Sequence, residues 1–112
     1  MTPYHPLAGR IVRREKVTRY LLDLTSPDGR GKARFFMAFG FHPDRPEELI
    51  EALLEHGDSQ PILDIWHDPW GRHVEVVGPI TSPDGRNPTI LTAWVQDQDG
   101  DIRLATAYPY AK

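Results

Sequence analysis

The sequence has no cysteine, no long apolar run and no strong excess of one charge. Without cysteine there is neither a disulfide framework nor a thiolate zinc site, so a packed core must hold the fold. No stretch reaches the ~20 apolar residues of a membrane span, and the first residues lack the basic-then-apolar pattern of a secretion signal. We therefore expect a cytoplasmic protein that makes no use of a membrane. The net charge of -3 argues against gross nonspecific binding to nucleic acid.

Charge is nevertheless unevenly distributed along the chain. Residues 1–36 carry eight Lys/Arg against three Asp/Glu, a net charge of +5, whereas residues 37–112 carry five against thirteen, a net charge of -8. A basic first third on an acidic body could hold an anionic partner, or the two parts could neutralise each other once folded. Mutual neutralisation is the simpler expectation.

Three helices are predicted in the first half of the chain. A length of 112 residues suits one domain, residues 1–112, which buries roughly two-thirds of its unfolded surface. Apolar residues spaced three and four apart predict helices over about 14–24, 29–39 and 44–57. Pro46 and the two glutamates after it favour the start of the third helix, and Gly57 favours its end.

The apolar period changes to two after residue 60. This alternation predicts strands over 62–67, 73–77, 89–96 and 102–108. Short connections rich in Asp, Gly and Pro imply that successive strands are antiparallel neighbours. We therefore predict an α+β fold, with about three N-terminal helices packed on one face of a four-stranded antiparallel meander. The hexapeptide Thr-Ser-Pro-Asp-Gly-Arg occurs at 25–30 and 81–86, which we interpret as reuse of good turn chemistry.

The start of the second predicted helix is the strongest candidate for a binding site. Arg30, Gly31 and Lys32 combine cations with exposed backbone at a helix N-terminus, where free N–H groups and the dipole favour an anion. Arg34 adds a further cation, and a phosphate would compensate this unfavourable clustering. The alternative is that carboxylates of the chain itself, such as Asp28, supply the negative charge. The spacing of a P-loop is absent.

A second candidate is a set of polar residues on the last two predicted strands. Thr92 lies on the third strand, and alternation places Thr106 and Tyr108 on the same half-buried face as Leu104. Hydroxyl groups there, close to the helix that carries Lys32, could line a cleft. The ordinary preference of threonine and tyrosine for strands explains them equally simply.

Histidine is the usual side chain for proton transfer near neutral pH. Of the five histidines, we nominate His73 as a general acid or base, because it begins a strand beside a turn. A metal site built from Asp64, His67 and His73 is conceivable, but these positions match no recognised ligand spacing. We therefore expect no metal and no other cofactor.

Several segments together resemble a known family. They are residues 16–22, residues 27–36 with 40–41, and residues 76–80, 92–94 and 104–109. The most distinctive are Gly-Lys-Ala-Arg-Phe-Phe at 31–36 and Thr-Ala-Tyr-Pro at 106–109. Over about residues 16–109 the sequence is similar to an uncharacterised bacterial family, a domain of unknown function. Its members occur as small standalone chains and as C-terminal tails of large secreted toxins.

The resemblance implies a toxin-like role, often beside a small antitoxin or immunity protein. Helices followed by a meander are also similar to the ribonuclease group of barnase, the colicin nucleases and RelE-type toxins, by analogy of fold. Family members are expected to carry His-Pro where this chain has Ser26-Pro27. If that histidine is catalytic in the family, its replacement would impair this chain.

Two functions therefore stand as hypotheses. The first is a metal-independent endoribonuclease toxin that acts on RNA. In it the phosphate is held by Lys32 and Arg34 and oriented by Thr92, Thr106 and Tyr108, and a proton is transferred by His73. The second is a non-catalytic protein-interaction module, which the missing histidine at Ser26 and the negative net charge favour.

Overall fold

The computed structural model describes residues 9–111. Helical segments occupy the first half of the chain and strands the second. They are α1 (Arg14–Lys16), η1 (Val17–Leu21), α2 (Arg30–Ala38), α3 (Pro46–Ser59), β1 (Ile62–Asp68), β2 (Gly71–Pro79), β3 (Thr89–Gln96) and β4 (Ile102–Pro109). The strands form one antiparallel sheet in the order β1-β2-β3-β4. The predicted α+β fold with a four-stranded meander is confirmed.

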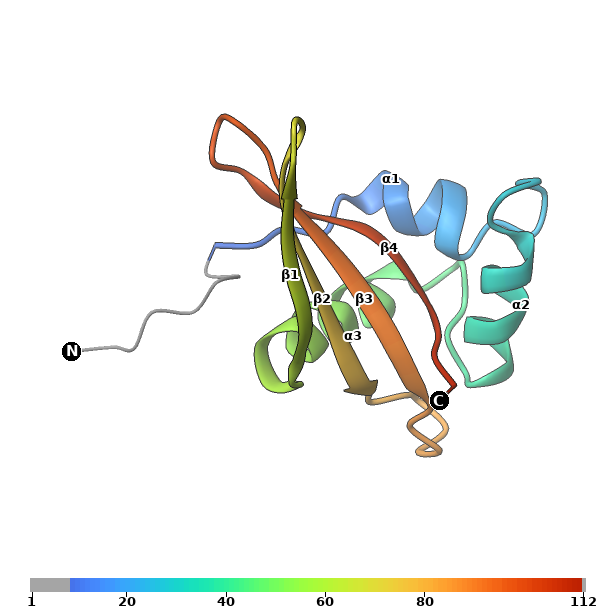
Figure 1. Cartoon of the computed structure of the whole chain (residues 1–112). Coiled ribbons are helices and arrows are strands. Elements are labelled where there is room, and N and C mark those ends of the chain that lie inside the picture. The colour runs from blue at the N-terminus through green and yellow to red at the C-terminus, as the bar shows by residue number, and fades with distance from the viewer. Residues whose placement is uncertain (1–8, 112) are drawn as a thin grey trace.

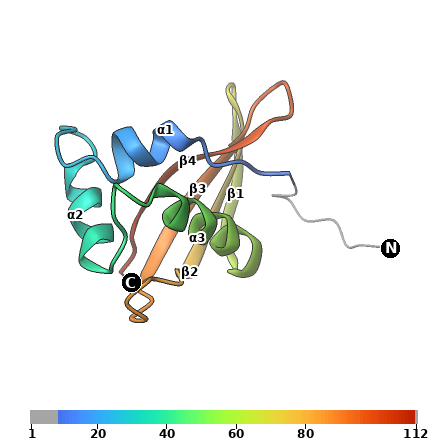
Figure 2. The same cartoon turned by 180° about the vertical axis from the view of Figure 1, so that it is seen from behind.

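The helices lie around the sheet in two groups. Helix α3 lies across one face, as seen from behind in Figure 2, while the opposite face is open toward the viewer in Figure 1. Segments α1 and η1 form one short rod that leads to α2, and α2 stands beside β4 (Figure 1). Ahead of α1, Ile11 pairs with the outer side of β4 by hydrogen bonds to Ile102 and Leu104. Within residues 9–111, no helix is long and apolar enough to cross a membrane.

The core lies between the sheet and the helices. Alternation along the central strands turns Val74, Val76, Ile90 and Trp94 toward α3, where all four are buried. Helix α3 packs an apolar stripe against these residues, and the stripe follows the 3.6-residue period of the helix. The helical residues that complete this core are Val17, Leu21, Leu22, Phe36, Phe41, Leu49, Ala52 and Leu53.

Two predicted helix ends differ from the structure. The first helix stops at Leu21 instead of 24, because the carboxylate of Asp23 accepts hydrogen bonds from the backbone and hydroxyl of Thr25 and turns the chain. The third helix continues to Ser59 past Gly57, whose missing side chain leaves room for the ring of Trp94. A Cβ atom at Gly57 would lie 2.8 Å from that ring.

A β-bulge in β4 changes the faces that strict alternation predicts. Trp94 pairs with Leu104 and Ala93 pairs with Thr106, so Ala105 is an extra residue on β4. Leu104 therefore shares the buried face with Trp94, whereas Thr106 and Tyr108 lie on the opposite face of the sheet, with Ala93 and the buried Leu91. The expectation that Thr106 and Tyr108 share a face with Leu104 is wrong.

His56 on α3 connects that helix to the buried face of the sheet. Its Nε2 lies 2.9 Å from the carbonyl oxygen of Gly78, which can only accept, so Nε2 carries the proton. Its Nδ1 then accepts from the Thr92 hydroxyl at 3.0 Å, and Thr92 accepts from Trp94 Nε1 at 2.9 Å. The neutral imidazole is thus fully satisfied. Burial lowers the pKa of His56 below its usual 6.5, although the Gly78 carbonyl opposes this shift.

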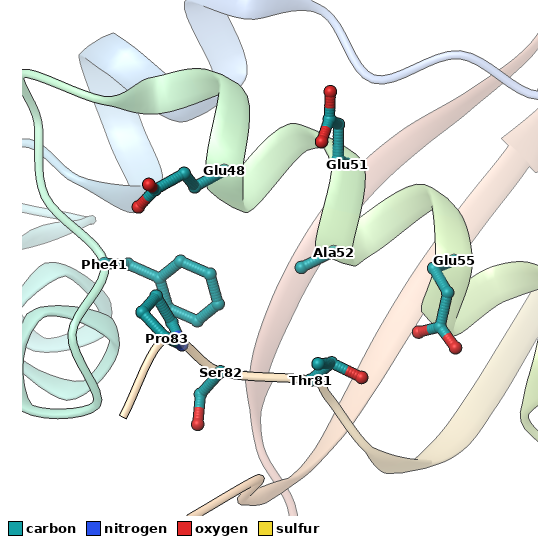
Figure 3. A pocket seen from close by; sticks show the side chains of 8 residues that line it. All are labelled: Phe41, Glu48, Glu51, Ala52, Glu55, Thr81, Ser82 and Pro83. Atoms are coloured by element: carbon teal, nitrogen blue, oxygen red, sulfur yellow. The ribbon is translucent and has the colours of Figure 1, made fainter. Parts of the chain in front are cut away.

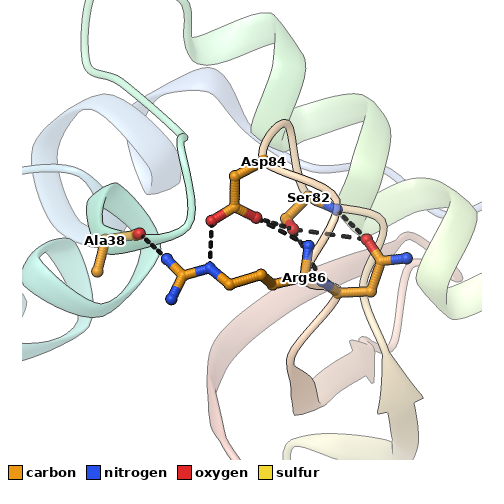
Figure 4. A network of polar contacts seen from close by, with 5 residues as sticks. Ala38, Ser82, Asp84 and Arg86 are labelled. Atoms are coloured by element: carbon orange, nitrogen blue, oxygen red, sulfur yellow. Dashed lines mark hydrogen bonds and ion pairs between the residues drawn. The ribbon is translucent and has the colours of Figure 1, made fainter.

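The second copy of the repeated hexapeptide attaches the β2–β3 loop to the end of α2. Arg86 donates to Asp84 and to the carbonyl oxygen of Ala38, one of the last carbonyl groups of α2 (Figure 4). Its guanidinium also lies 4.4 Å from the centroid of the Phe39 ring. A cation is favourable at this negative end of a helix dipole. The loop therefore helps to hold α2 in its position beside the sheet.

We predict that Thr92→Val lowers the free energy of unfolding much more than Thr106→Val does. The first change leaves two buried groups, His56 Nδ1 and Trp94 Nε1, without a partner, at a cost of about 1–3 kcal/mol each. Thr106 is only partly buried, so its change should cost less than about 1 kcal/mol. Urea unfolding of both variants measures the difference. Equal losses would contradict the assigned network.

Candidate functional site

Tyr20 is the centre of a polar cluster on the open side of β4. Its hydroxyl lies 3.4 Å from Oγ1 of Thr106, a contact between residues 86 positions apart. The Nζ atom of Lys32, in the first turn of α2, lies 5.1 Å from the centroid of the Tyr20 ring, and that of Lys16 lies 5.2 Å from it. Segments α1, η1, α2 and β4 therefore bring a phenol, two ammonium groups and a hydroxyl together.

Gly29 makes this meeting possible. A Cβ atom at this position would lie only 2.1 Å from the carbonyl oxygen of Tyr20, so only glycine permits the turn before α2 to pack against η1. Ser26 shapes the same turn, because its side-chain oxygen accepts from the Gly29 N–H at 3.2 Å and its carbonyl from the Arg30 N–H at 3.0 Å. Ser26, where the resemblance implies histidine, thus has a local structural role.

The surrounding cations change the acidity of Tyr20. Burial acts to raise the pKa of the phenol, whereas hydrogen bonding with Lys32 and Thr106 and the charges of Lys32 and Lys16 act to lower it. The lowering effects are the larger in sum, and the pKa of Tyr20 lies below its usual 10.0. A phenol with this property gives up its proton more readily than an ordinary tyrosine, which suits it to proton transfer.

The structure brings some of the predicted site residues together and separates others. Lys32, Thr106 and Tyr108 lie on the same side, with Tyr108 about 7 Å along β4 from Thr106. Arg34 is two residues from Lys32 and therefore about 200° around the axis of α2. Arg30, Gly31 and Arg34 are all exposed on α2.

His73 lies on the open face but apart from Tyr20. Its Nε2 is 2.9 Å from a carboxylate oxygen of Asp68, and its ring stacks on Trp66 with centroids 3.8 Å apart. In the sheet register His73 is level with Val95, one row away from the pair Ala93 and Thr106. Its Cα is therefore roughly 12 Å from that of Thr106.

Thr92 is fully buried on the opposite face of the sheet, where it serves His56 and Trp94. Its hydroxyl therefore cannot reach a bound phosphate in the folded chain. The conceivable metal ligands are also divided, because His67 pairs with Arg72 and therefore faces away from Asp64 and His73. Over residues 9–111, no group of three or more His, Cys, Asp or Glu side chains is placed to hold a metal ion.

Three further residues of this face were not predicted. Tyr20 and Lys16 lie in the first predicted helix, and only the fold shows that this helix meets β4. Glu75 pairs with Ala93, which pairs with Thr106, so Glu75 and Thr106 face each other across one small residue. Their Cα atoms are about 10 Å apart. Glu75 is two residues from His73 on the same strand, so strict alternation places both on the open face. This alternation is the sequence signal that could have identified Glu75.

A groove on the α3 side has a different character. It has a volume of about 440 Å³ and lies between α3 and the loop that follows β2 (Figure 3). Phe41, Ala52 and Pro83 give it apolar walls, while Glu48, Glu51 and Glu55 surround it with carboxylates (Figure 3). Its lining includes no Lys or Arg, so a polyanion such as RNA would be repelled there.

Comparison with known proteins gives one family and one fold. The model of the family described as "Domain of unknown function (DUF6883)" matches residues 7–111. No curated protein matches the sequence. Among solved structures, a chain of the "Contact-dependent growth inhibition toxin - immunity protein complex from Klebsiella pneumoniae 342" is similar, with a TM-score of 0.71 and 18% sequence identity. The similarity covers 89% of this chain and 99% of that chain, and it shows a shared fold.

We predict opposite effects for two alanine substitutions at the start of α2. Gly29→Ala forces a methyl group onto the Tyr20 carbonyl and should lower the free energy of unfolding by about 1–3 kcal/mol. Gly31→Ala meets nothing within 4 Å and should raise it by about 0.5–1 kcal/mol, because alanine favours a helix. Denaturant unfolding of both variants checks this, and a Gly29→Ala protein as stable as Gly31→Ala would contradict the close contact.

Proposed function

The chain belongs to the DUF6883 family, and we propose that it is a metal-independent endoribonuclease that acts as a toxin beside an immunity or antitoxin protein. One observation carries the catalytic part of this proposal. It is the acidified phenol of Tyr20, held between Lys16 and Lys32 and next to the Thr106 hydroxyl. This is the group on the described part of the chain that is best suited to a phosphate and to proton transfer.

The toxin part of the proposal is supported by the shared fold. The similar chain comes from a complex of a contact-dependent growth inhibition toxin with its immunity protein. The similarity extends over nearly the whole of both chains, so it concerns the complete fold and not one motif. A role within a toxin system, with a protein partner, is the function that this similarity favours.

The proposed reaction needs no metal or other cofactor. The 2′-oxygen of a ribose attacks the adjacent phosphorus, a P–O2′ bond forms and the P–O5′ bond breaks. The 2′-hydroxyl loses its proton to a base, and the leaving 5′-oxygen receives one from an acid. The products are a 2′,3′-cyclic phosphate and a 5′-hydroxyl. Negative charge that accumulates on the phosphate in the transition state is stabilised by fixed cations.

Each part of this chemistry has a proposed residue. Lys32 and Lys16 hold the phosphate, and Tyr20 gives its proton to the 5′-oxygen. Thr106 and Tyr108 orient the phosphate from β4. Arg30 and Arg34, exposed on α2, contact the RNA backbone on either side of the cleaved bond, where their distance from Tyr20 is no obstacle.

For the base we propose Glu75 in place of His73. Glu75 is directly across Ala93 from Thr106, and the small Ala93 side chain leaves space for a ribose between them. His73 is a row farther away and is already engaged by Asp68 and Trp66. His73 therefore serves as the comparison residue, and cleavage that depends on His73 but not on Glu75 would restore the original nomination.

A non-catalytic interaction module is the second candidate function. The observation that favours it is the apolar surface of β1, four of whose large side chains are exposed. This surface lies away from the Tyr20 cluster, so the two functions can also coexist in one molecule.

We predict that the purified chain cleaves total bacterial RNA into discrete fragments in the presence of a chelator. Tyr20→Phe removes the proton donor and should reduce the rate by about 10²–10⁴-fold. Lys32→Ala removes a phosphate ligand and should reduce it by about 10²–10³-fold. Glu75→Gln should also abolish most of the cleavage. Gel electrophoresis of the RNA, with mapping of the fragment ends, is the measurement.

Arg45→Ala is the matched control, because Arg45 is an exposed cation outside the cluster and its side chain pairs with Glu48. Its cleavage rate should equal that of the parent protein. Intact RNA with the folded parent protein would overturn the nuclease proposal. Cleavage that survives Tyr20→Phe and Lys32→Ala would place the active site elsewhere.

A further inference from the structure

The edge strand β1 exposes an unusual amount of apolar surface. Every residue from Ile62 to His67 is exposed, and the large apolar side chains keep 39% (Ile62), 51% (Leu63), 43% (Ile65) and 41% (Trp66) of their surface in contact with solvent. Trp70, in the turn after β1, is 74% exposed. Scattered apolar residues are normal on a surface, but several large ones gathered on one edge strand and the turn after it indicate an interaction site.

The two edges of the sheet differ in how far other segments of the chain cover them. The β4 edge is partly covered, because Ile11 pairs with it and α2 stands beside it. On the β1 edge, no backbone hydrogen bond from another segment of residues 9–111 reaches the outer side of the strand. Free backbone groups on an edge strand form a template for a further strand.

The apolar side chains of β1 point to both faces of the sheet. Ile65 pairs with Val74 and so lies on the α3 face, whereas Trp66 pairs with His73 and lies on the open face. A helix or loop on one face would cover only half of them. A strand added at the edge carries side chains on both faces and can cover Ile65 and Trp66 together. The run from Asp64 to Asp68 is regular, so it can accept such a strand.

The charges around β1 indicate the character of that strand. Strand β1 carries Asp64 and Asp68 and no Lys, Arg or Pro, the residues that commonly protect an edge. Residues 62–109, which form the sheet and its loops, carry seven Asp/Glu against three Lys/Arg, a net charge of -4, so two copies of this sheet would repel each other when joined at β1. A strand rich in Lys and Arg is complementary to this edge.

We propose that β1 is the docking edge for a basic, extended segment of a partner protein, which adds to the sheet as a fifth, antiparallel strand. On the α3 face, Ile65 packs against the apolar residues of the added strand. On the open face, the cations of that strand pair with the exposed Asp64, and their apolar stems lie against Trp66. This docking does not depend on the nuclease chemistry, because β1 is three strands away from Thr106 and Tyr20.

The test uses a synthetic seven-residue peptide that alternates lysine with valine, added to the full chain. We expect half-saturation below about 1 mM, with slowed amide hydrogen exchange confined to residues 64–68 in NMR spectra. Two N-methylated forms of the peptide, modified on opposite sets of alternate amides, distinguish strand addition from loose contact. Only one of them should lose binding, because an added strand uses alternate N–H groups.

Ile65→Lys should weaken binding of the parent peptide at least tenfold, since it places a cation on the edge. Leu24→Lys is the matched control, because Leu24 is a 47% exposed apolar residue outside the sheet. Its affinity should stay unchanged, and unchanged circular dichroism shows that both variants are folded. A peptide with glutamate in place of lysine should not bind.

Three results would overturn the proposal. They are absence of binding at millimolar peptide, equal binding of the acidic and basic peptides, and slowed exchange outside β1. Analytical ultracentrifugation of the chain alone tests whether a second copy of the chain occupies this edge. A dimer that becomes monomeric in Ile65→Lys would show that β1 pairs with a second copy instead of a basic partner.

Discussion

The contact between Gly29 and the carbonyl of Tyr20 is the constraint on which the candidate site depends. A helix that starts with three cations in five residues would normally point them into solvent, away from one another. Here the absence of a side chain at Gly29 lets the start of α2 pack directly against η1. Lys32 is thereby held over the Tyr20 ring, and Tyr20 is held against Thr106. Four segments of sequence become one site through this single close approach.

The two faces of the sheet have different roles. On the α3 face, the chain of hydrogen bonds from Trp94 through Thr92 to His56 and Gly78 satisfies every polar group that it buries. On the open face, Glu75, Thr106 and Tyr108 are held at fixed positions by the strands but are not used by the core. A rigid scaffold with polar side chains on its free face is what precise positioning of a substrate requires. The bulge at Ala105 is the element that turns Thr106 and Tyr108 to this free face.

Much of the fold could be predicted from the sequence, because its local signals agree with the tertiary structure. The four strands, their antiparallel order, and helices α2 and α3 follow from apolar periodicity and turn chemistry. Thr92 and Thr106 look alike in a strand pattern, and only the bulge, one inserted residue, assigns them to opposite faces. Tyr20 could not be assigned to the site, because its contact with Thr106 spans 86 positions. Alternation at β1 predicts a half-buried strand, whereas its position at the sheet edge leaves it exposed.

The measurement that tests the candidate site most directly is the titration of Tyr20. The chain has four tyrosines, and Tyr20→Phe identifies the Tyr20 signal in NMR spectra of protein labelled with carbon-13 at the tyrosine Cζ. We expect the pKa of Tyr20 to lie below 10.0 in the parent protein, because Lys32 and Lys16 favour the phenolate. Lys32→Met keeps the bulk of the side chain and removes its charge, so it should raise that pKa. A pKa that does not change in Lys32→Met would show that Lys32 and Tyr20 do not act together, and would contradict the site.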